Sequence, residues 1–298
     1  MSRLKTTFVY DLLMRLLLGL WYLLSVLPRS WHLRLAQPMG RFCCWVSPRR
    51  SRIIDANLAL CFPSLAPDAR QRLRDDHLYY LGLSLFDTAV AWYWSLASIP
   101  QSIPHQFVGL EDFLRVQQRS EQGILLMSMH VQHLELSAFL LGTQVDYKVV
   151  ARSYQAQSLN ATTQRVRGRF ASEVASSNNP RQFIRWLKNG KTLVYYPDQD
   201  YGLKRSVQTT LFDVPATWTT APYTLYKHSN CLLYLFHTYY VDGVLMLAFE
   251  PLSLPCEDAL SFTTGLAQAI EQSIAQQPSQ YLWAHRRFKS TLGKAYCL

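Results

Sequence analysis

Several features that would define a function class outright are missing from this 298-residue sequence. Its six cysteines include no C-x-x-C pair and no zinc-ribbon spacing, which excludes a small structural zinc module. No glycine-rich phosphate cradle occurs, so we predict no nucleotide site. No internal repeat is visible and no low-complexity linker divides the chain, so one large domain is favoured over two small ones.

The cysteines give no sign of a disulfide framework. Cys43 and Cys44 are adjacent, which is a poor geometry for a bond between them. We therefore expect reduced thiols, buried or close to a membrane, in a cytoplasmic setting.

Acidic residues are scarce relative to basic ones. Lysine and arginine number 30 against 20 aspartates and glutamates, which gives a formal net charge of +10. Such a balance indicates an anionic partner: nucleic acid, anionic lipid, a phosphorylated substrate or an acidic protein. The basic residues are spread along the chain and no recognised nucleic-acid-binding motif is present, so a nucleic-acid partner is disfavoured.

The N-terminal segment is apolar but lacks an uninterrupted membrane-spanning run. The clean stretch from Leu16 to Leu27 is about 12 residues, short of the roughly 20 needed to cross a bilayer, and Asp11 and Arg15 interrupt its flank. A signal peptide is disfavoured because Pro28-Arg-Ser-Trp31 is not a small-residue cleavage site. A tilted anchor and an interfacial amphipathic helix remain open. The arginines that follow favour the anionic cytoplasmic leaflet, so we predict a membrane-attached helix over residues 1–30 and a second unit over residues 31–298.

The rest of the chain alternates helical and strand patterns, which predicts an α/β fold with a mixed central sheet flanked by helices. Asp242-Gly243 is a hairpin signal between two of the expected strands. The expected helices cover residues 51–62, 68–95, 157–175, 180–189 and 257–276, and the expected strands cover 147–152, 192–196, 232–240 and 244–250.

One stretch, Gly123 to Glu135, combines an apolar strand pattern with a histidine and a carboxylate. Five residues separate His130 from Glu135, which on one helix would place them roughly 140° apart. They meet only if His130 lies in the turn after the strand and Glu135 in the first turns of the next helix. We predict that helix over 132–142, with Gly142 as a C′ glycine. A neutral imidazole beside a carboxylate is a general base with an orienting acid.

Two alternatives for this stretch remain open. A core histidine with a satisfied hydrogen bond is an equally good description of His130. His130, His133 and Glu135 also form a candidate metal set, although His130 would then need helical geometry and a third ligand.

Three polar residues follow expected strands directly: His130, Arg152 and Asp198. In open α/β sheets, ligands bind in the crevice beyond the carboxyl ends of the strands, so these side chains are candidates for one site. Arg165, Arg167 and Arg169 lie two residues apart and fan out on a helix, facing either a site or solvent.

The ordered set of these stretches resembles the late (secondary) acyltransferases of bacterial lipid A biosynthesis, in the lysophospholipid acyltransferase-like superfamily. That family has a glycine before the histidine and Phe-Gly-Asn-Trp after it, where this chain has Met129 and Val131-Gln-His-Leu134; the H-x4-E spacing itself is intact. The matching stretches are the N-terminal apolar segment, Asn57-Leu-Ala-Leu-Cys-Phe-Pro63, His130 to Glu135, Ala151-Arg152, Arg167-Gly-Arg169, Pro197-Asp-Gln-Asp-Tyr-Gly202 and Pro278 to Lys289.

The resemblance implies an enzyme at the cytoplasmic face of the cell inner membrane. It would move a fatty acyl chain from acyl carrier protein to a hydroxyl of a 3-hydroxyacyl chain on a lipid A precursor. His130 and Glu135 would be the catalytic pair, and Arg152, Arg167, Arg169 and Asp198 would bind substrate or stabilise the oxyanion. No metal, nucleotide or other cofactor is required for this chemistry.

Two other functions stay open on the sequence. An acyltransferase of the same superfamily acting on another glycolipid or a lysophospholipid would use the same chemistry on a different acceptor. A non-catalytic membrane protein that binds anionic lipid through its basic surface would need neither His130 nor Glu135 and would depend on total charge and salt.

Overall fold

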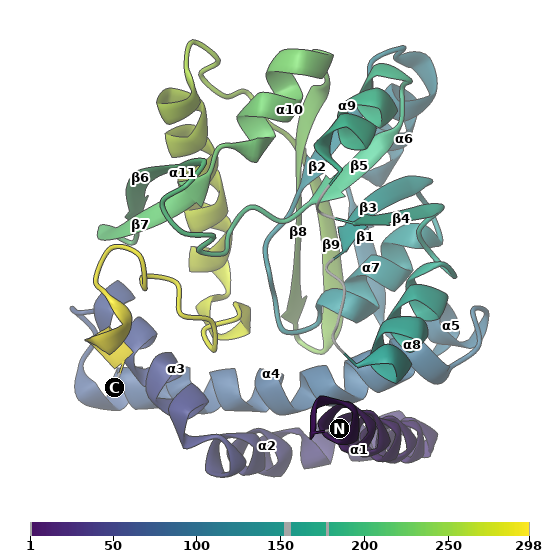
Figure 1. Ribbon diagram of the computed structural model, residues 1–298, viewed down its shortest axis with the longest axis vertical. Coiled ribbons are helices and arrows are strands. Elements are labelled where there is room, and N and C mark those ends of the chain that lie inside the picture. The colour runs from purple at the N-terminus through teal and green to yellow at the C-terminus, as the bar shows by residue number, and fades with distance from the viewer. Residues whose placement is uncertain (1, 152–155, 177–178, 298) are drawn as a thin grey trace.

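A mixed β-sheet forms the centre of the molecule. The computed structural model describes residues 2–151, 156–176 and 179–297, and within them seven strands form one sheet in the order β1-β9-β8-β2-β5-β3-β4 (Figure 1). The β8–β9 pair is antiparallel and the other neighbours are parallel. The strands are β1 (His105–Val108), β2 (Ile124–Met127), β3 (Tyr147–Ala151), β4 (Glu173–Ser176), β5 (Thr192–Tyr195), β8 (Leu232–Val241) and β9 (Val244–Pro251). The predicted α/β fold with a mixed central sheet is confirmed.

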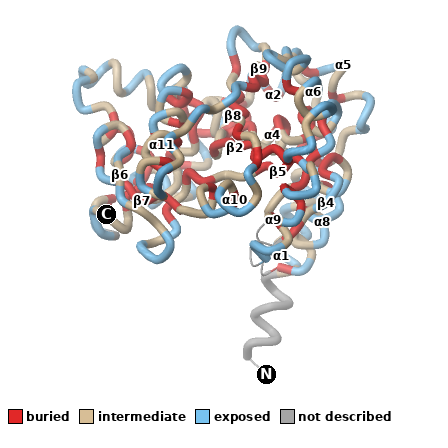
Figure 2. The backbone as a smooth tube through the Cα atoms, turned by 90° about the horizontal axis from the view of Figure 1, so that it is seen from above, coloured by how far each residue is buried: buried red, intermediate tan, exposed pale blue. Residues whose placement is uncertain are grey.

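Strand β2 shows why the sheet lies in the middle. All four of its residues are buried, and they alternate between two cores: Leu125 and Met127 face one, Ile124 and Leu126 the other. A parallel strand covered on both faces gives a continuous apolar run, which is the pattern seen in the sequence. Figure 2 shows the buried segments concentrated in these central strands.

Helices cover both faces of the sheet. The core containing Leu125 and Met127 is completed by α3 (Pro48–Cys61), α9 (Pro180–Lys188), α10 (Ala221–Ser229), α11 (Ala259–Gln276) and a hairpin of β6 (Ser206–Leu211) and β7 (Val214–Thr219). The other core is completed by α4 (Pro67–Tyr93), α5 (Ser98–Ser102), α6 (Leu110–Arg119), α7 (Leu134–Gly142) and α8 (Gln157–Arg167). Two short 3-10 helices, η1 (Pro278–Gln280) and η2 (Lys294–Cys297), follow near the C-terminus.

The first two helices lie against α4 rather than apart from the domain. Helix α1 (Ser2–Val26) packs along α4, where Trp21 Nε1 donates to the Leu85 carbonyl at 2.6 Å and Trp94 Nε1 donates to the Ser25 carbonyl at 2.6 Å. Helix α2 (Arg29–Val46) crosses α4 and forms the lower layer in Figure 1. Within the described residues, no helix combines the length and apolar character required to span a bilayer.

Several predicted boundaries were wrong. The helix expected over 157–175 ends at Arg167, and the chain turns at Gly168 into the edge strand β4. Gly142 is the last residue of α7 and not a C′ residue with positive φ. A side chain at Gly142 would collide with the Phe170 carbonyl, so close approach explains this glycine. Asp242 and Gly243 do adopt positive φ, 49° and 80°, in the predicted hairpin turn.

Candidate active site

The pairing of β2 with β5 brings His130 and Asp198 together. Met127 and Tyr195 are register partners at the ends of these parallel strands, and each candidate residue follows its strand end by the same three positions. The pairing extends one residue further, because the Ser128 amide donates to the Tyr195 carbonyl at 2.9 Å. The two turns therefore leave the sheet side by side.

Both carboxylate oxygens of Asp198 contact His130. His130 Nδ1 lies 2.7 Å from Asp198 Oδ1, and the His130 amide donates to Oδ2 at 2.9 Å. The Tyr281 hydroxyl also donates to Oδ2, at 3.1 Å. Burial raises the pKa of Asp198, which is 1% exposed, but the charge and hydrogen bonds of His130 outweigh burial and leave that pKa below its ordinary value. An ionised Asp198 accepts from Nδ1–H, so Nε2 is the ring nitrogen that can act as a base.

Glu135 lies in the first turn of α7 and is held by two other groups. Arg167, in the last turn of α8, donates from Nη2 to Glu135 Oε1 at 2.6 Å. Trp92 Nε1 donates to Glu135 Oε2 at 3.2 Å. Both charged side chains of this pair are less than a fifth exposed, so the pair is a strong, partly desolvated one.

The hydrogen-bond partners of His130 and Glu135 in the structure differ from those that the sequence predicts. The sequence pairs His130 with Glu135, whereas the structure places the Nδ1 side of the ring on Asp198 and the Glu135 carboxylate on Arg167. A separation of 68 residues hides the His130–Asp198 contact from any local spacing argument. The sheet order alone reveals it.

One cavity of about 400 Å³ is lined by His130 of the first pair and by both residues of the second. Its polar end carries His130, Glu135 and Arg167, and the Tyr196 ring centroid lies 5.2 Å from that of His130. The remaining lining is mostly apolar: Val131, Leu134, Ala138, Tyr147, Val149, Val150, Phe170, Gln199 and Leu282. A base beside an apolar cavity suits a ligand that carries a hydroxyl on a hydrocarbon chain.

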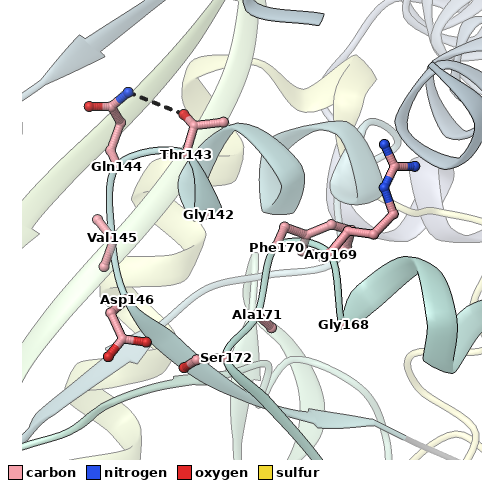
Figure 3. A pocket seen from close by; sticks show the side chains of 10 residues that line it. All are labelled: Gly142, Thr143, Gln144, Val145, Asp146, Gly168, Arg169, Phe170, Ala171 and Ser172. Atoms are coloured by element: carbon pink, nitrogen blue, oxygen red, sulfur yellow. Dashed lines mark hydrogen bonds between the residues drawn. The ribbon is translucent and has the colours of Figure 1, made fainter. Parts of the chain in front are cut away.

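One of the predicted arginines, Arg169, is not among the residues that line this cavity. Arg169 points away from the neighbouring shallow hollow between residues 142–146 and 168–172 (Figure 3), and it donates to the Trp92 and Trp94 carbonyls at 2.9 and 2.6 Å. It thus satisfies carbonyls at the C-terminal end of α4. Arg152 lies outside the described residues.

The candidate metal set does not converge. His133 Nε2 contacts Thr238 Oγ1 at 3.0 Å in the core, while His130 and Glu135 have the partners given above. Burial lowers the pKa of His133 to about 4, so its ring is neutral. Among the residues that the structure describes, no group of three metal-ligating side chains is present.

The sequence analysis missed two residues that hold the site. Trp92 lies in the expected helix over 68–95, and Tyr281 belongs to the closing stretch after Pro278. Their polar atoms contact Glu135 and Asp198, respectively. A buried tryptophan N–H or tyrosine O–H needs a partner, and that requirement is the available signal.

The fold and cavity thus define an α/β protein with an oriented histidine at the mouth of an apolar pocket. Comparison with known families is specific. The model of the bacterial lipid A biosynthesis acyltransferase family matches residues 5–290, and the chain belongs to that family. A lipid A biosynthesis lauroyltransferase of Escherichia coli K12 is 30% identical over 279 residues, covering 92% of this chain and 90% of the relative.

Two further relatives carry related names. A lipid A biosynthesis palmitoleoyltransferase of Escherichia coli K12 is 29% identical over 249 residues, covering 81% of this chain and 79% of that protein. A lipid A biosynthesis acyltransferase of Haemophilus influenzae is 28% identical over 251 residues, covering 82% and 79%. The resemblance drawn from the motifs is confirmed at the family level.

Proposed function

We propose that this protein transfers a fatty acyl chain from acyl carrier protein to a hydroxyl of a 3-hydroxyacyl chain on a lipid A precursor. Family membership supports the reaction class and the lipid A precursor as acceptor. The single structural observation that carries the proposal is the His130 ring, held through Nδ1 by buried Asp198 and lining an apolar cavity.

The first step is deprotonation of the acceptor hydroxyl. His130 Nε2 takes the proton as the oxygen attacks the thioester carbonyl carbon. Asp198 keeps Nδ1 protonated and offsets the charge of the imidazolium that forms. The Tyr281 hydroxyl and the His130 amide occupy the second Asp198 oxygen and fix the carboxylate in this orientation.

The attack gives a tetrahedral intermediate with a negative oxygen. Arg167 lines the cavity and is the cation available to stabilise that oxygen or an acceptor phosphate. Collapse of the intermediate breaks the C–S bond, completes the new ester, and releases a thiolate. The thiolate takes the proton from the imidazolium, so the histidine returns to its neutral form.

Glu135 acts through Arg167 in this scheme. Its carboxylate accepts from the guanidinium on one oxygen and from Trp92 on the other. The pair fixes the side chain of Arg167 at the cavity, and we propose that Glu135 is a positioning residue for that guanidinium. The predicted dyad role, in which Glu135 holds the imidazole itself, is separated from this one by the variants in the Discussion.

We also propose that the protein attaches to the cytoplasmic face of the inner membrane through its first two helices. Helices α1 and α2 expose many large apolar side chains, including Leu16 (65%), Leu23 (64%) and Trp45 (76%). Arg34, Arg41, Arg49 and Arg50 lie in the same part of the chain and suit an anionic surface. In this arrangement residues 1–30 begin the attachment, and residues 31–298 form the acyltransferase domain with α2 as part of its membrane face.

The decisive experiment measures acyl transfer by a purified variant and analyses the lipid A of cells that carry the same variant. His130→Ala is expected to lower transfer by about a thousandfold or more while the purified protein remains folded. His105→Ala, on the edge strand β1, is the matched control and should retain activity. Mass spectrometry of lipid A from cells with each variant should show one acyl chain missing only for His130→Ala.

Other outcomes separate the remaining functions. If cells with His130→Ala have unchanged lipid A but an altered glycolipid or phospholipid, the enzyme performs the same reaction on a different acceptor. Normal turnover by purified His130→Ala would leave an anionic-lipid binder as the better description.

A further inference from the structure

A second cavity lies on the opposite side of β5 from the active site. It measures about 690 Å³ and is bordered by α9, α10 and the loop after β5. Its walls are apolar and aromatic, and its rim carries two cations. The lining residues are Pro180, Phe183, Ile184, Tyr195, Tyr201, Lys204, Arg205, Thr219, Thr220, Ala221, Thr224 and Leu225.

The two cavities share one segment of chain. Tyr195 lines the second cavity and Tyr196 lines the active-site cavity, because successive residues at a strand end point to opposite faces. Gln199 then lines the first cavity and Tyr201 the second. The linings of the two cavities thus alternate along the segment that follows β5.

Two carboxylates, Asp198 and Asp200, hold this segment in place through hydrogen bonds. Asp198 is held by His130 and Tyr281, and Asp200 accepts from the Ser290 amide and hydroxyl at 2.9 and 2.7 Å. Arg205 is fixed as well, since its carbonyl accepts from the Thr220 amide at 3.1 Å. The rim of the second cavity is thus preorganised on the same loop that supplies the partner of the catalytic histidine.

The charge around this cavity is one-sided. Lys204 and Arg205 are exposed, and in the described part of the chain no carboxylate forms an ion pair with either. Helix α9 adds the exposed cations Arg181, Arg185 and Lys188. The carboxylates between residues 180 and 227 are Asp198 and Asp200, both buried, and Asp213 in the β6–β7 turn.

We propose that this second cavity is the docking site of the acyl donor, an acidic carrier protein that presents its acyl chain on a phosphate-linked thiol arm. Lys204 and Arg205 would contact the phosphate and acidic side chains of the carrier, and the apolar walls would hold the arm. The inference rests on the proposed function, because it assigns a place to the donor of that reaction. Cations on a rim and apolar walls below match an anionic carrier with a largely uncharged arm.

The position of the cavity favours the soluble donor over the lipid acceptor. Helices α9 and α10 lie at the end of the molecule opposite α1 and α2 (Figure 1). Helices α1 and α2 carry exposed apolar side chains, which suit the entry of a lipid from a bilayer. A carrier docked at α9 and α10 thus approaches from water and leaves the lipid side open.

Charge reversal tests the proposal directly. The double variant Lys204→Glu/Arg205→Glu should raise KM for the carrier-linked donor by about tenfold or more, and added salt should shrink that difference. Lys191→Glu reverses an exposed charge at the opposite end of β5 and should leave kinetics within about twofold. Thermal unfolding midpoints check that each variant is folded.

Binding is measured separately from turnover. Holo acyl carrier protein is titrated against the His130→Ala enzyme by calorimetry, with and without the double charge reversal, which should weaken the affinity about tenfold. Absence of transfer by the unmutated enzyme with retained carrier binding would defeat the proposed reaction and spare the docking site. An unchanged donor KM and affinity, or a rise confined to the KM for the lipid acceptor, would overturn the docking site.

Discussion

The histidines of this protein differ in what their rings face. His130 contacts an ionised carboxylate and opens onto a cavity. His77 and His133 lie in the core, where burial lowers the pKa of each to about 4 and keeps the ring neutral. A general base needs a fixed orientation and access to a ligand, and His130 has both through Asp198 and the cavity.

The first residue-scale prediction concerns Asp198. Asp198→Asn keeps the shape of the side chain but removes the charge that offsets the imidazolium and permits the wrong tautomer. We expect kcat to fall about a thousandfold or more, with a smaller change in KM for the acceptor. Asp213→Asn, in the exposed β6–β7 turn, is the control and should behave like the unmutated enzyme.

The second residue-scale prediction separates two roles for Glu135. If it positions Arg167, Glu135→Gln and Arg167→Met should impair transfer by similar factors, and the double variant should be little worse than either. If Glu135 orients the imidazole as the sequence spacing predicts, Glu135→Gln should be nonadditive with His130 variants and independent of Arg167. Steady-state kinetics of the three variants distinguish these results.

Among the helices, the crossing of α2 over α4 depends on two glycines. A side chain at Gly40 would collide with the Leu78 carbonyl, and one at Gly82 with the Ala36 carbonyl. Backbone meets backbone at this crossing, so neither neighbour can yield by rotating a side chain. Helix α2 is thereby held directly against the helix that carries Trp92.

Gly82→Ala is therefore expected to destabilise the protein by roughly 1–3 kcal/mol. Gly19, on exposed α1, has no atom within 4 Å of an added side chain, so Gly19→Ala should be neutral or slightly stabilising. Denaturant unfolding of both variants makes the comparison. Equal midpoints for the two would mean that the α2–α4 contact relaxes freely.

Membrane attachment is also tested on single helices. Phe42 and Trp45 form an exposed aromatic pair on α2, with ring centroids 5.9 Å apart. Phe42→Ser/Trp45→Ser should lower cosedimentation with anionic vesicles severalfold, because both rings would lose their place in the interface. Leu260→Ser on α11 removes a comparably exposed apolar group and should have no effect. Equal loss from both variants would indicate nonspecific adsorption.

For the whole molecule, buried histidines make stability depend on pH. The folded pKa of His77, His133 and His285 is lowered to about 4, mainly by burial, below the unfolded value near 6.5. Between these values the unfolded chain binds more protons than the folded one, so stability is complete above pH 6.5 and falls with acidification towards pH 4.

The free energy of unfolding should accordingly drop on the order of 1–2 kcal/mol per histidine between pH 7 and pH 5. Denaturant titrations at several pH values measure this slope, and His77→Gln should reduce it. A flat profile over that interval would show that these rings are not kept neutral. The carboxylate of Asp198 does not interfere, because its lowered pKa places its contribution below about pH 4.

Local patterns predicted much of the architecture. The apolar run of β2, the hairpin at Asp242-Gly243 and the helices expected over 51–62 and 180–189 all follow from side-chain periodicity and backbone preference. The edge strands β1 and β4 and the β6–β7 hairpin were missed, because short strands without clear alternation carry little local signal.

The sequence predicted part of the candidate site. His130 and Asp198 were identified from their places after strand ends, and Arg167 from the family resemblance. In the structure His130 and Arg167 line one cavity, and Asp198 contacts His130. The sequence spacing did not predict which carboxylate Arg167 and His130 each contact, because the residues of these contacts are 32 and 68 positions apart in the chain.

The sequence by itself determined the composition of this protein's surface and core, its α/β class and the family to which it belongs, because these depend on residue types and their order. The tertiary structure decided the partners. Parallel pairing of β2 with β5 set Asp198 against His130, and the folded arrangement placed Arg167 at the end of α8 within reach of Glu135 at the start of α7. Contacts between distant segments depend on which elements become neighbours, and the global packing of the sheet and its helices fixes that choice.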